Sequence, residues 1–163
     1  MEAVKQGSIC LGLRSNEYVV LCSLKRLPSE LAEYQEKLFK VDDYIGLVMS
    51  GLTADARVLC KYMRNESLNF KLTYGSNQPL NRLIYKVAES TLLLILESQH
   101  KTQKSSKRPY GVGLLVAGVD RDGPHLYETC PSGNYYEYYV IRLINLGLCN
   151  WSPITICKNI RGG

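Results

Sequence analysis

The sequence predicts an α+β fold in which antiparallel sheet and helix form separate layers. Short apolar segments of strand character open the chain and return after residue 110, and the stretch between them places apolar residues at helical spacing. This order of strands, helices and strands favours separate layers over alternating βαβ units. The chain has 163 residues, of which 45% are hydrophobic and 21% charged, which suits one domain with a sizeable core and excludes a wholly disordered chain.

Four short strands are expected in the first fifty residues. Ile9–Leu13 and Tyr18–Leu24 are apolar and rich in residues that favour strands, and the polar stretch 14–17 between them is typical of a hairpin loop. Leu38–Val41 and Ile45–Met49 repeat this pattern around a turn-like pair of aspartates. The close spacing predicts antiparallel pairing.

Two helices are expected next. Thr53 is the predicted N-cap of the first helix, and Asp55 lies in its first turn, where a carboxylate interacts favourably with the helix dipole. The apolar face of this helix has i, i+3, i+4, i+7 spacing and comprises Ala56, Leu59, Cys60 and Met63. After a loop over 75–78, Pro79 suits the first position of the second helix. The apolar face of that helix comprises Leu80, Leu83, Ile84, Val87 and Ala88.

Strands are expected again after the helices. Gly111–Val119 is a mostly apolar run, and the Asp-Gly pair that ends the turn Asp120–Gly123 is a strong hairpin signal. His125–Cys130 is the predicted partner strand. A dense aromatic run follows, which favours a packed or edge strand over a surface for base stacking; it comprises Tyr135, Tyr136, Tyr138 and Tyr139.

The net charge of +5 is unevenly distributed. All fifteen acidic residues lie in 1–140 with seventeen basic ones, which leaves +2 there, and residues 141–163 contribute the other +3. The densest basic cluster, His100–Arg108, has four bases in nine residues and no interleaved aromatic residue. A solvated loop is therefore favoured over the alternative of a nucleic-acid-binding module that uses this segment.

The six cysteines form no CxxC motif and no cluster with histidine, so a zinc site and a secreted disulfide framework are both disfavoured. A reduced compartment, cytosolic or nuclear, is expected. No apolar run approaches the roughly 20 residues of a membrane span. The start, Met1–Lys5, lacks the basic-then-apolar order of a secretory signal.

No catalytic constellation stands out from the residues alone. His125 and Cys130 could form a nucleophilic pair, but their odd spacing directs them to opposite faces of one predicted strand. The GxG at Gly111–Gly113 lacks a third glycine and does not open a helix, so it is no dinucleotide-binding loop. We therefore expect no metal and no cofactor.

Several stretches resemble one family over most of residues 1–140. They are Met1–Arg26, Gly51–Leu59 (GLTADARVL), Arg108–Gly118 (RPYGVGLLVAG) and Gly123–Asn134 (GPHLYETCPSGN), and in this order they are similar to proteasome α-type subunits, most of all to the α type-1 branch. The resemblance implies an N-terminal-nucleophile-hydrolase-like four-layer αββα sandwich. In this chain the sandwich is expected to be incomplete, with the third to fifth helices missing or replaced.

The resemblance also implies a function. Members are non-catalytic structural and gating subunits in the outer α ring of the 20S core particle, and they act in ubiquitin-dependent protein degradation. The expected partners are the other proteasome α and β subunits and regulatory particles that dock on the ring, with no nucleic acid and no membrane. The expected location is the cytoplasm and nucleus.

Catalytic proteasome β subunits use an N-terminal threonine whose free amine is the base. The matching positions here are Ser8 for the threonine, Leu24 for a supporting aspartate and Lys40 for a lysine. Ser8 is internal and Leu24 is apolar, which favours a non-catalytic subunit. The alternative is a hydrolase matured by cleavage before Ser8. Lys25, in the LKR segment, matches a family lysine that pairs with the C-terminal carboxylate of a regulator's tail.

The sequence departs from the family in three places. Family members have a helix and a gate-forming segment before the position of Met1, Leu92–Ser98 resembles an insertion, and the resemblance ends near Val140. These departures are typical of a mispredicted gene, with a late start, an unspliced insertion and intron read-through at the end, and a divergent functional isoform is the alternative. We expect a domain over 1–140 and a divergent tail over 141–163 outside the native fold. A short strand or turn is compatible with the start of this tail, and irregular chain is expected beyond Asn150.

Overall fold

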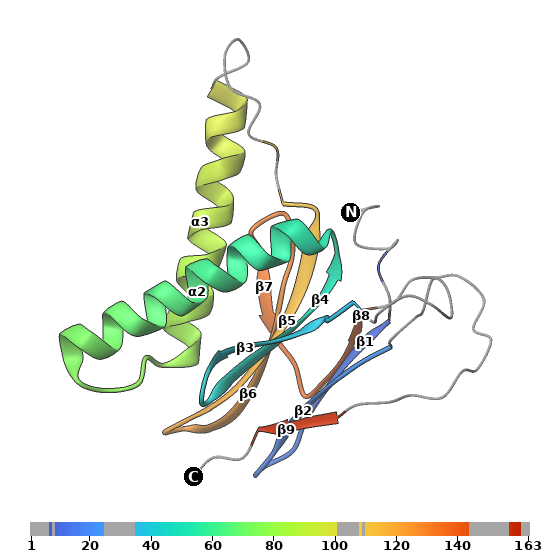
Figure 1. Cartoon of the computed structure of the whole chain (residues 1–163), viewed down its shortest axis with the longest axis vertical. Coiled ribbons are helices and arrows are strands. Elements are labelled where there is room, and N and C mark those ends of the chain that lie inside the picture. Colours follow the sequence, from blue (N-terminus) through green and yellow to red (C-terminus); the bar gives the residue numbers. More distant parts are fainter. Residues whose placement is uncertain are drawn as a thin grey trace.

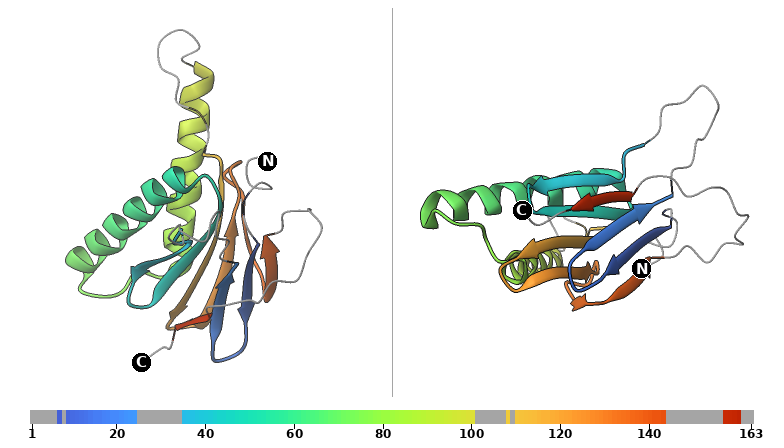
Figure 2. Two further views of the ribbon diagram at one scale, coloured as in Figure 1. Left: turned by 45° about the vertical axis from the view of Figure 1, so that its right-hand side comes forward. Right: turned by 90° about the horizontal axis from the view of Figure 1, so that it is seen from below.

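Two antiparallel sheets lie face to face, and two helices cover the outer face of one of them (Figures 1 and 2). The computed structural model describes residues 7, 9–24, 35–100, 108, 110–143 and 157–160. These residues form three layers, helices over sheet over sheet, which confirms the prediction of an incomplete α+β sandwich.

The five-stranded sheet, in the order β3-β4-β5-β6-β7, contains the predicted second and third hairpins. Its strands are β3 (Leu38–Asp42), β4 (Ile45–Gly51), β5 (Val112–Asp120), β6 (Gly123–Thr129) and β7 (Tyr135–Glu137). All neighbouring strands are antiparallel. The tyrosine-rich run begins in β7 at the sheet edge, as predicted.

The four-stranded sheet has the order β8-β1-β2-β9. The predicted first hairpin forms its centre, and the strands are β1 (Cys10–Arg14), β2 (Val19–Ser23), β8 (Val140–Leu143) and β9 (Cys157–Ile160). All three pairings are antiparallel.

Strand β9 corrects one sequence-based expectation. Irregular chain was expected beyond Asn150, but Cys157–Ile160 pairs with β2. The hairpin β1–β2 alone would leave two open edges, and an unpaired edge is a template for further backbone hydrogen bonds. The tail supplies both missing neighbours, since β8 pairs with the other edge. The domain boundary placed at residue 140 stays a prediction.

The helices are α2 (Thr53–Tyr74) and α3 (Leu80–His100). The predicted cap at Thr53 is wrong by one position, because Leu52 occupies the N-cap without a side-chain hydrogen bond and the Thr53 hydroxyl instead accepts one from Gln35. Pro79 was predicted as the first residue of the second helix, but α3 begins one residue later, at Leu80. Leu92–Ser98, interpreted as an insertion, continues α3 as helix.

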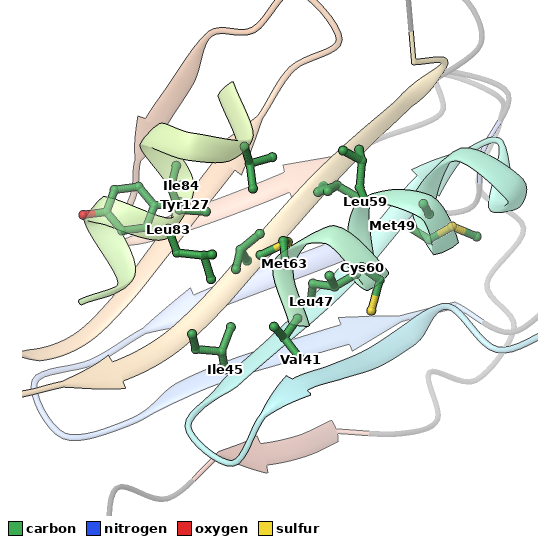
Figure 3. Packing of buried hydrophobic residues seen from close by; sticks show 14 of the residues in the cluster. Val41, Ile45, Leu47, Met49, Leu59, Cys60, Met63, Leu83, Ile84 and Tyr127 are labelled. Atoms are coloured by element: carbon green, nitrogen blue, oxygen red, sulfur yellow. The ribbon is translucent and has the colours of Figure 1, made fainter. Parts of the chain in front are cut away.

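Both predicted apolar helical faces are buried. Helix α2 packs over β3, β4 and β5, while α3 packs over β5, β6 and β7. Their apolar residues meet alternate residues of the central strands, including Leu47 and Met49 of β4 (Figure 3). Val48, between these two, faces the other sheet in a second cluster with Cys10 and Leu126. Because successive side chains of β4 point to opposite faces of the sheet, this strand contributes to two separate cores.

Glycine allows a close approach between the sheets. A Cβ added at Gly12 of β1 would lie 2.8 Å from a methyl carbon of Leu126 in β6. A larger residue there would therefore require the Leu126 side chain to move.

Candidate functional site

The positions that match the catalytic residues of β subunits form no catalytic group among the described residues. Lys40 Nζ lies 2.6 Å from Asp43 Oδ1, and the Lys40 side chain is 58% exposed. This confirms the interpretation of Lys40 as a paired surface lysine. Leu24 is half-buried, and its backbone N–H donates to the Ile9 carbonyl at 3.0 Å. Ser8 lies outside the described residues, so its role stays a prediction.

His125 and Cys130, the candidate nucleophilic pair, each contact carboxylates instead of each other. His125 Nδ1 lies 2.7 Å from Glu137 Oε1, and its Nε2 lies 3.2 Å from Asp120 Oδ1. The Cys130 thiol instead faces Glu128 at 3.9 Å. Burial, together with the Glu128 carboxylate, raises the pKa of Cys130, so the less nucleophilic thiol form is favoured.

The two most distinctive sequence motifs meet at the N-terminal end of α2. Asp55 is buried, and its carboxylate accepts two hydrogen bonds from Arg108, Nη1 to Oδ2 at 2.7 Å and Nη2 to Oδ1 at 2.9 Å. The Gly111 backbone N–H donates to Asp55 Oδ2 at 2.8 Å. The Gly111 carbonyl accepts from the Leu52 N–H at 3.0 Å. GLTADARVL is thereby joined to RPYGVGLL across more than fifty residues of sequence.

Glycine is required at this junction. Gly51 has φ of +120°, and a Cβ added there would lie 2.4 Å from the Gly111 carbonyl oxygen. A side chain at Gly51 would therefore be strained and would also clash with backbone. The Leu52–Gly111 backbone hydrogen bond and the Asp55–Arg108 ion pair together fix the start of α2 relative to the start of β5.

The protonation of Asp55 reflects these contacts. Burial by itself would raise the pKa of Asp55, but the hydrogen bonds from Arg108 and Gly111 outweigh burial, and the pKa lies below its ordinary value. Asp55 is therefore an ionised, fully engaged carboxylate at neutral pH, which is the arrangement of a structural ion pair.

A second polar cluster links the two sheets. Arg14 of β1 forms a salt bridge with Glu137 of β7 and lies 4.8 Å from the centre of the Tyr139 ring. Burial opposes ionisation of Glu137, but hydrogen bonds and charge from His125 and Arg14 hold its pKa below the ordinary value. Burial and the nearby Glu137 charge raise the pKa of Tyr127 to about 12.

Sequence reasoning missed both clusters. It assigned Asp55 to the helix dipole and Arg108 to a basic loop. The only signal in the sequence was the opposite charge of Asp55 and Arg108, each of which belongs to a glycine-containing motif. Opposite charge alone does not identify which residues pair. Lys25 and residues 101–107 lie outside the described residues, so the regulator contact and the basic loop stay predictions.

The part of the chain that the structure describes offers neither a metal site nor a membrane-spanning helix. No group of three or more His, Cys, Asp or Glu side chains there could hold a metal ion. Neither described helix combines the length and the apolarity that crossing a membrane requires.

Comparison with known proteins identifies close relatives. The family model described as "Proteasome subunit" matches residues 4–142. The chain is 53% identical to proteasome subunit alpha type-1 of Dictyostelium discoideum over 143 residues, which cover 88% of this chain and 55% of that protein. It is 45% identical to proteasome subunit alpha type-1 of Drosophila melanogaster over 84% of this chain and 47% of the relative.

A yeast relative extends this result. The chain is 44% identical to proteasome subunit alpha type-6 of Saccharomyces cerevisiae over 85% of this chain and 56% of the relative. The chain therefore spans about half the length of the curated relatives that it matches.

Proposed function

Because the chain belongs to the proteasome subunit family, as a relative of its α-type members, we propose that it is a non-catalytic structural and gating subunit of the outer α ring of the 20S core particle. The similarity to α-type subunits over residues on both sides of the Asp55–Arg108 junction carries this proposal. Its partners in this role are the other α and β subunits, and it acts in ubiquitin-dependent degradation in the cytoplasm and nucleus.

Assembly is the direct test of the structural role. The chain would be tagged and co-expressed with the remaining α and β subunits of one organism, and particles would be isolated by size and examined by native mass spectrometry. We expect one copy of the tagged chain in each ring. Exclusion of the folded chain from the particles would contradict the proposal.

The proposal of a non-catalytic subunit is supported by apolar Leu24 and by the pairing of Lys40 with Asp43. An electrophile directed at N-terminal threonine should leave this chain unmodified, and mass spectrometry should find residues before Ser8 intact. Labelling of a newly exposed Ser8 in stoichiometric amount would favour the alternative, a hydrolase matured by cleavage at that position.

Gating is proposed to involve Lys25, whose ammonium group can bind a terminal carboxylate. Lys25→Ala in assembled particles should weaken activation by tail peptides by about 1.5–3 kcal/mol, the range for a charged hydrogen bond. Lys40→Ala is the matched control, because Lys40 is an exposed lysine with a local partner. Activation would be measured as peptide hydrolysis against tail concentration, and equal curves for both variants would contradict the role of Lys25.

A further inference from the structure

Two cysteines occupy directly opposed positions in the four-stranded sheet. Strand β9 pairs antiparallel with β2, and this register sets Cys157 opposite Cys22 (Figures 1 and 2). The two residues lie near opposite ends of the sequence, so their spacing along the chain gave no sign of a pair. Within the described strands, this is the one position where the register sets cysteine against cysteine.

The hydrogen bonds between β1 and β2 show which way the backbone of Cys22 is directed. At the open end of this hairpin, the Leu24 N–H donates to the opposed Ile9 carbonyl at 3.0 Å. Hydrogen-bonded and non-hydrogen-bonded pairs alternate along an antiparallel ladder, so the next hydrogen-bonded pair is Leu11 with Cys22. The backbone N–H and C=O of Cys22 are therefore directed to β1.

The pair of Cys22 and Cys157 is consequently of the non-hydrogen-bonded kind. A residue whose backbone groups bond to the strand on one side has none directed to the strand on its other side. The Cα atoms of such pairs are typically about 4.5 Å apart, closer than in hydrogen-bonded pairs. Disulfides span Cα separations of about 4.4–6.8 Å. The register thus places these two residues at a separation that a disulfide bridges without rearrangement of the strands.

The pair lies on the outer face of the four-stranded sheet. Residues alternate along β2, and Val19 and Leu21 belong to the core cluster between the two sheets, so Cys22 lies on the opposite face. Both described helices pack over the other sheet. Cys22 is 8% exposed, whereas Cys10, on the inner face, is completely buried. A small oxidant therefore reaches Cys22 from the outer face without opening the core.

The other cysteines whose side chains the structure describes have different surroundings. The Cys10 thiol donates to the Met49 carbonyl at 3.0 Å, and Cys60 is part of the core under α2. The Cys130 thiol faces Glu128. Oxidation to a disulfide needs a second cysteine at short range, so the register favours the pair on β2 and β9 over these residues.

We propose that Cys22 and Cys157 form a reversible disulfide that fastens strand β9 to β2 when a peroxide is present. Hydrogen peroxide oxidises one thiol to a sulfenic acid and releases one water. The other thiol attacks the sulfenic sulfur, which forms the S–S bond and releases a second water, so the electrons of the two thiols reduce the peroxide. A thiol reductant reverses the reaction by exchange.

The disulfide would act on the least supported strand of this sheet. Strand β9 has four residues and lies at the sheet edge. A bond between Cys22 and Cys157 closes a loop that contains most of the chain, and cross-links across long loops restrict the unfolded chain most. Oxidation should therefore stabilise the attachment of the tail. This modification is additional to the ring-subunit role proposed above and does not depend on it.

Mass spectrometry of the oxidised full chain tests the proposal. The reduced protein, at low concentration, is treated with one equivalent of hydrogen peroxide, remaining thiols are alkylated, and the protein is digested with trypsin without reduction. We expect the peptide 15–25 to be linked to the peptide 143–158 in most molecules, and fragmentation should place the bond at Cys157. Because Cys149 lies in the same tryptic peptide, Cys149→Ser is the matched control and should keep the link, whereas Cys157→Ser should reduce it at least 10-fold.

Further measurements make each outcome decisive. In concentrated urea the same oxidant should distribute Cys22 among the other cysteines, and an equal share of the Cys22–Cys157 link with and without urea would show that the fold does not direct it. Hydrogen exchange over 157–160 should slow on oxidation of the parent but not of Cys157→Ser. No link, a link of Cys22 to another cysteine, a covalent dimer, or unchanged exchange in the oxidised parent overturns the proposal.

Discussion

The two ends of helix α2 differ in whether the buried polar side chain next to them has hydrogen-bond partners. At its start, the Asp55 carboxylate is buried and accepts hydrogen bonds from Arg108 and from the Gly111 backbone. Beyond its end, the Gln78 side-chain amide is buried, and neither of its polar atoms has a hydrogen-bond partner among the described residues. A buried polar group with partners stabilises the fold, whereas one without partners costs free energy.

The largest effect is expected at the satisfied end. Asp55→Ala should lower the free energy of unfolding by about 2–3 kcal/mol, because it removes charged hydrogen bonds and leaves the Gly111 N–H without its acceptor. Urea unfolding followed by circular dichroism measures this. The control Asp122→Asn changes an exposed carboxylate at the other end and should stay within about 0.5 kcal/mol of the parent. Equal costs for the two variants would contradict the assignment of Asp55 as a structural anchor.

The pH dependence of stability should report the same anchor. The folded-state pKa of Asp55, and also that of Glu137, lies below its ordinary value, so each carboxyl binds protons less readily in the folded than in the unfolded chain. Their contribution is complete above the unfolded pKa values of about 4 and is lost as pH falls through the lower folded values. We expect the Tm to be level from neutral pH to about pH 5 and to fall below about pH 4.

Variants distinguish the two carboxyls. Asp55→Asn should flatten the acid limb of the curve more than Glu137→Gln, because the Glu137 side chain is 38% exposed and that of Asp55 only 12%. An unchanged acid limb in Asp55→Asn would show that the loss of stability has another origin.

The smallest effect, opposite in sign, is expected at the unsatisfied end. Gln78→Met replaces two unpaired polar atoms with an apolar side chain of similar size, and it should raise the free energy of unfolding by about 1 kcal/mol. Thermal unfolding of the chain gives this value. If Gln78→Met destabilised the protein as Asp55→Ala does, the two ends would not differ and the comparison would fail.

Much of the fold followed from local sequence patterns. The apolar residues of both helices recur at helical spacing, and the same residues are buried against the five-stranded sheet. The Asp-Gly pair at the β5–β6 turn correctly placed a hairpin, and the polar loop between β1 and β2 placed another. Such signals depend only on residues that are close together in the sequence, so they can be recognised without the structure.

Other features depend on segments far apart in the chain. The sequence alone determined where helices and hairpins form, which side of each helix is apolar, and which family the chain resembles, because periodicity, turn residues and motifs are local. Only the tertiary structure decided that Arg108 reaches Asp55 and that Cys157–Ile160 pairs with β2. It also decided that the Gln78 amide is enclosed with no partner for its side chain among the described residues. Packing decides which surfaces meet, and it therefore decides which charges and which strand edges pair and whether a buried amide finds a partner. Residue spacing along the chain is local and does not encode such contacts.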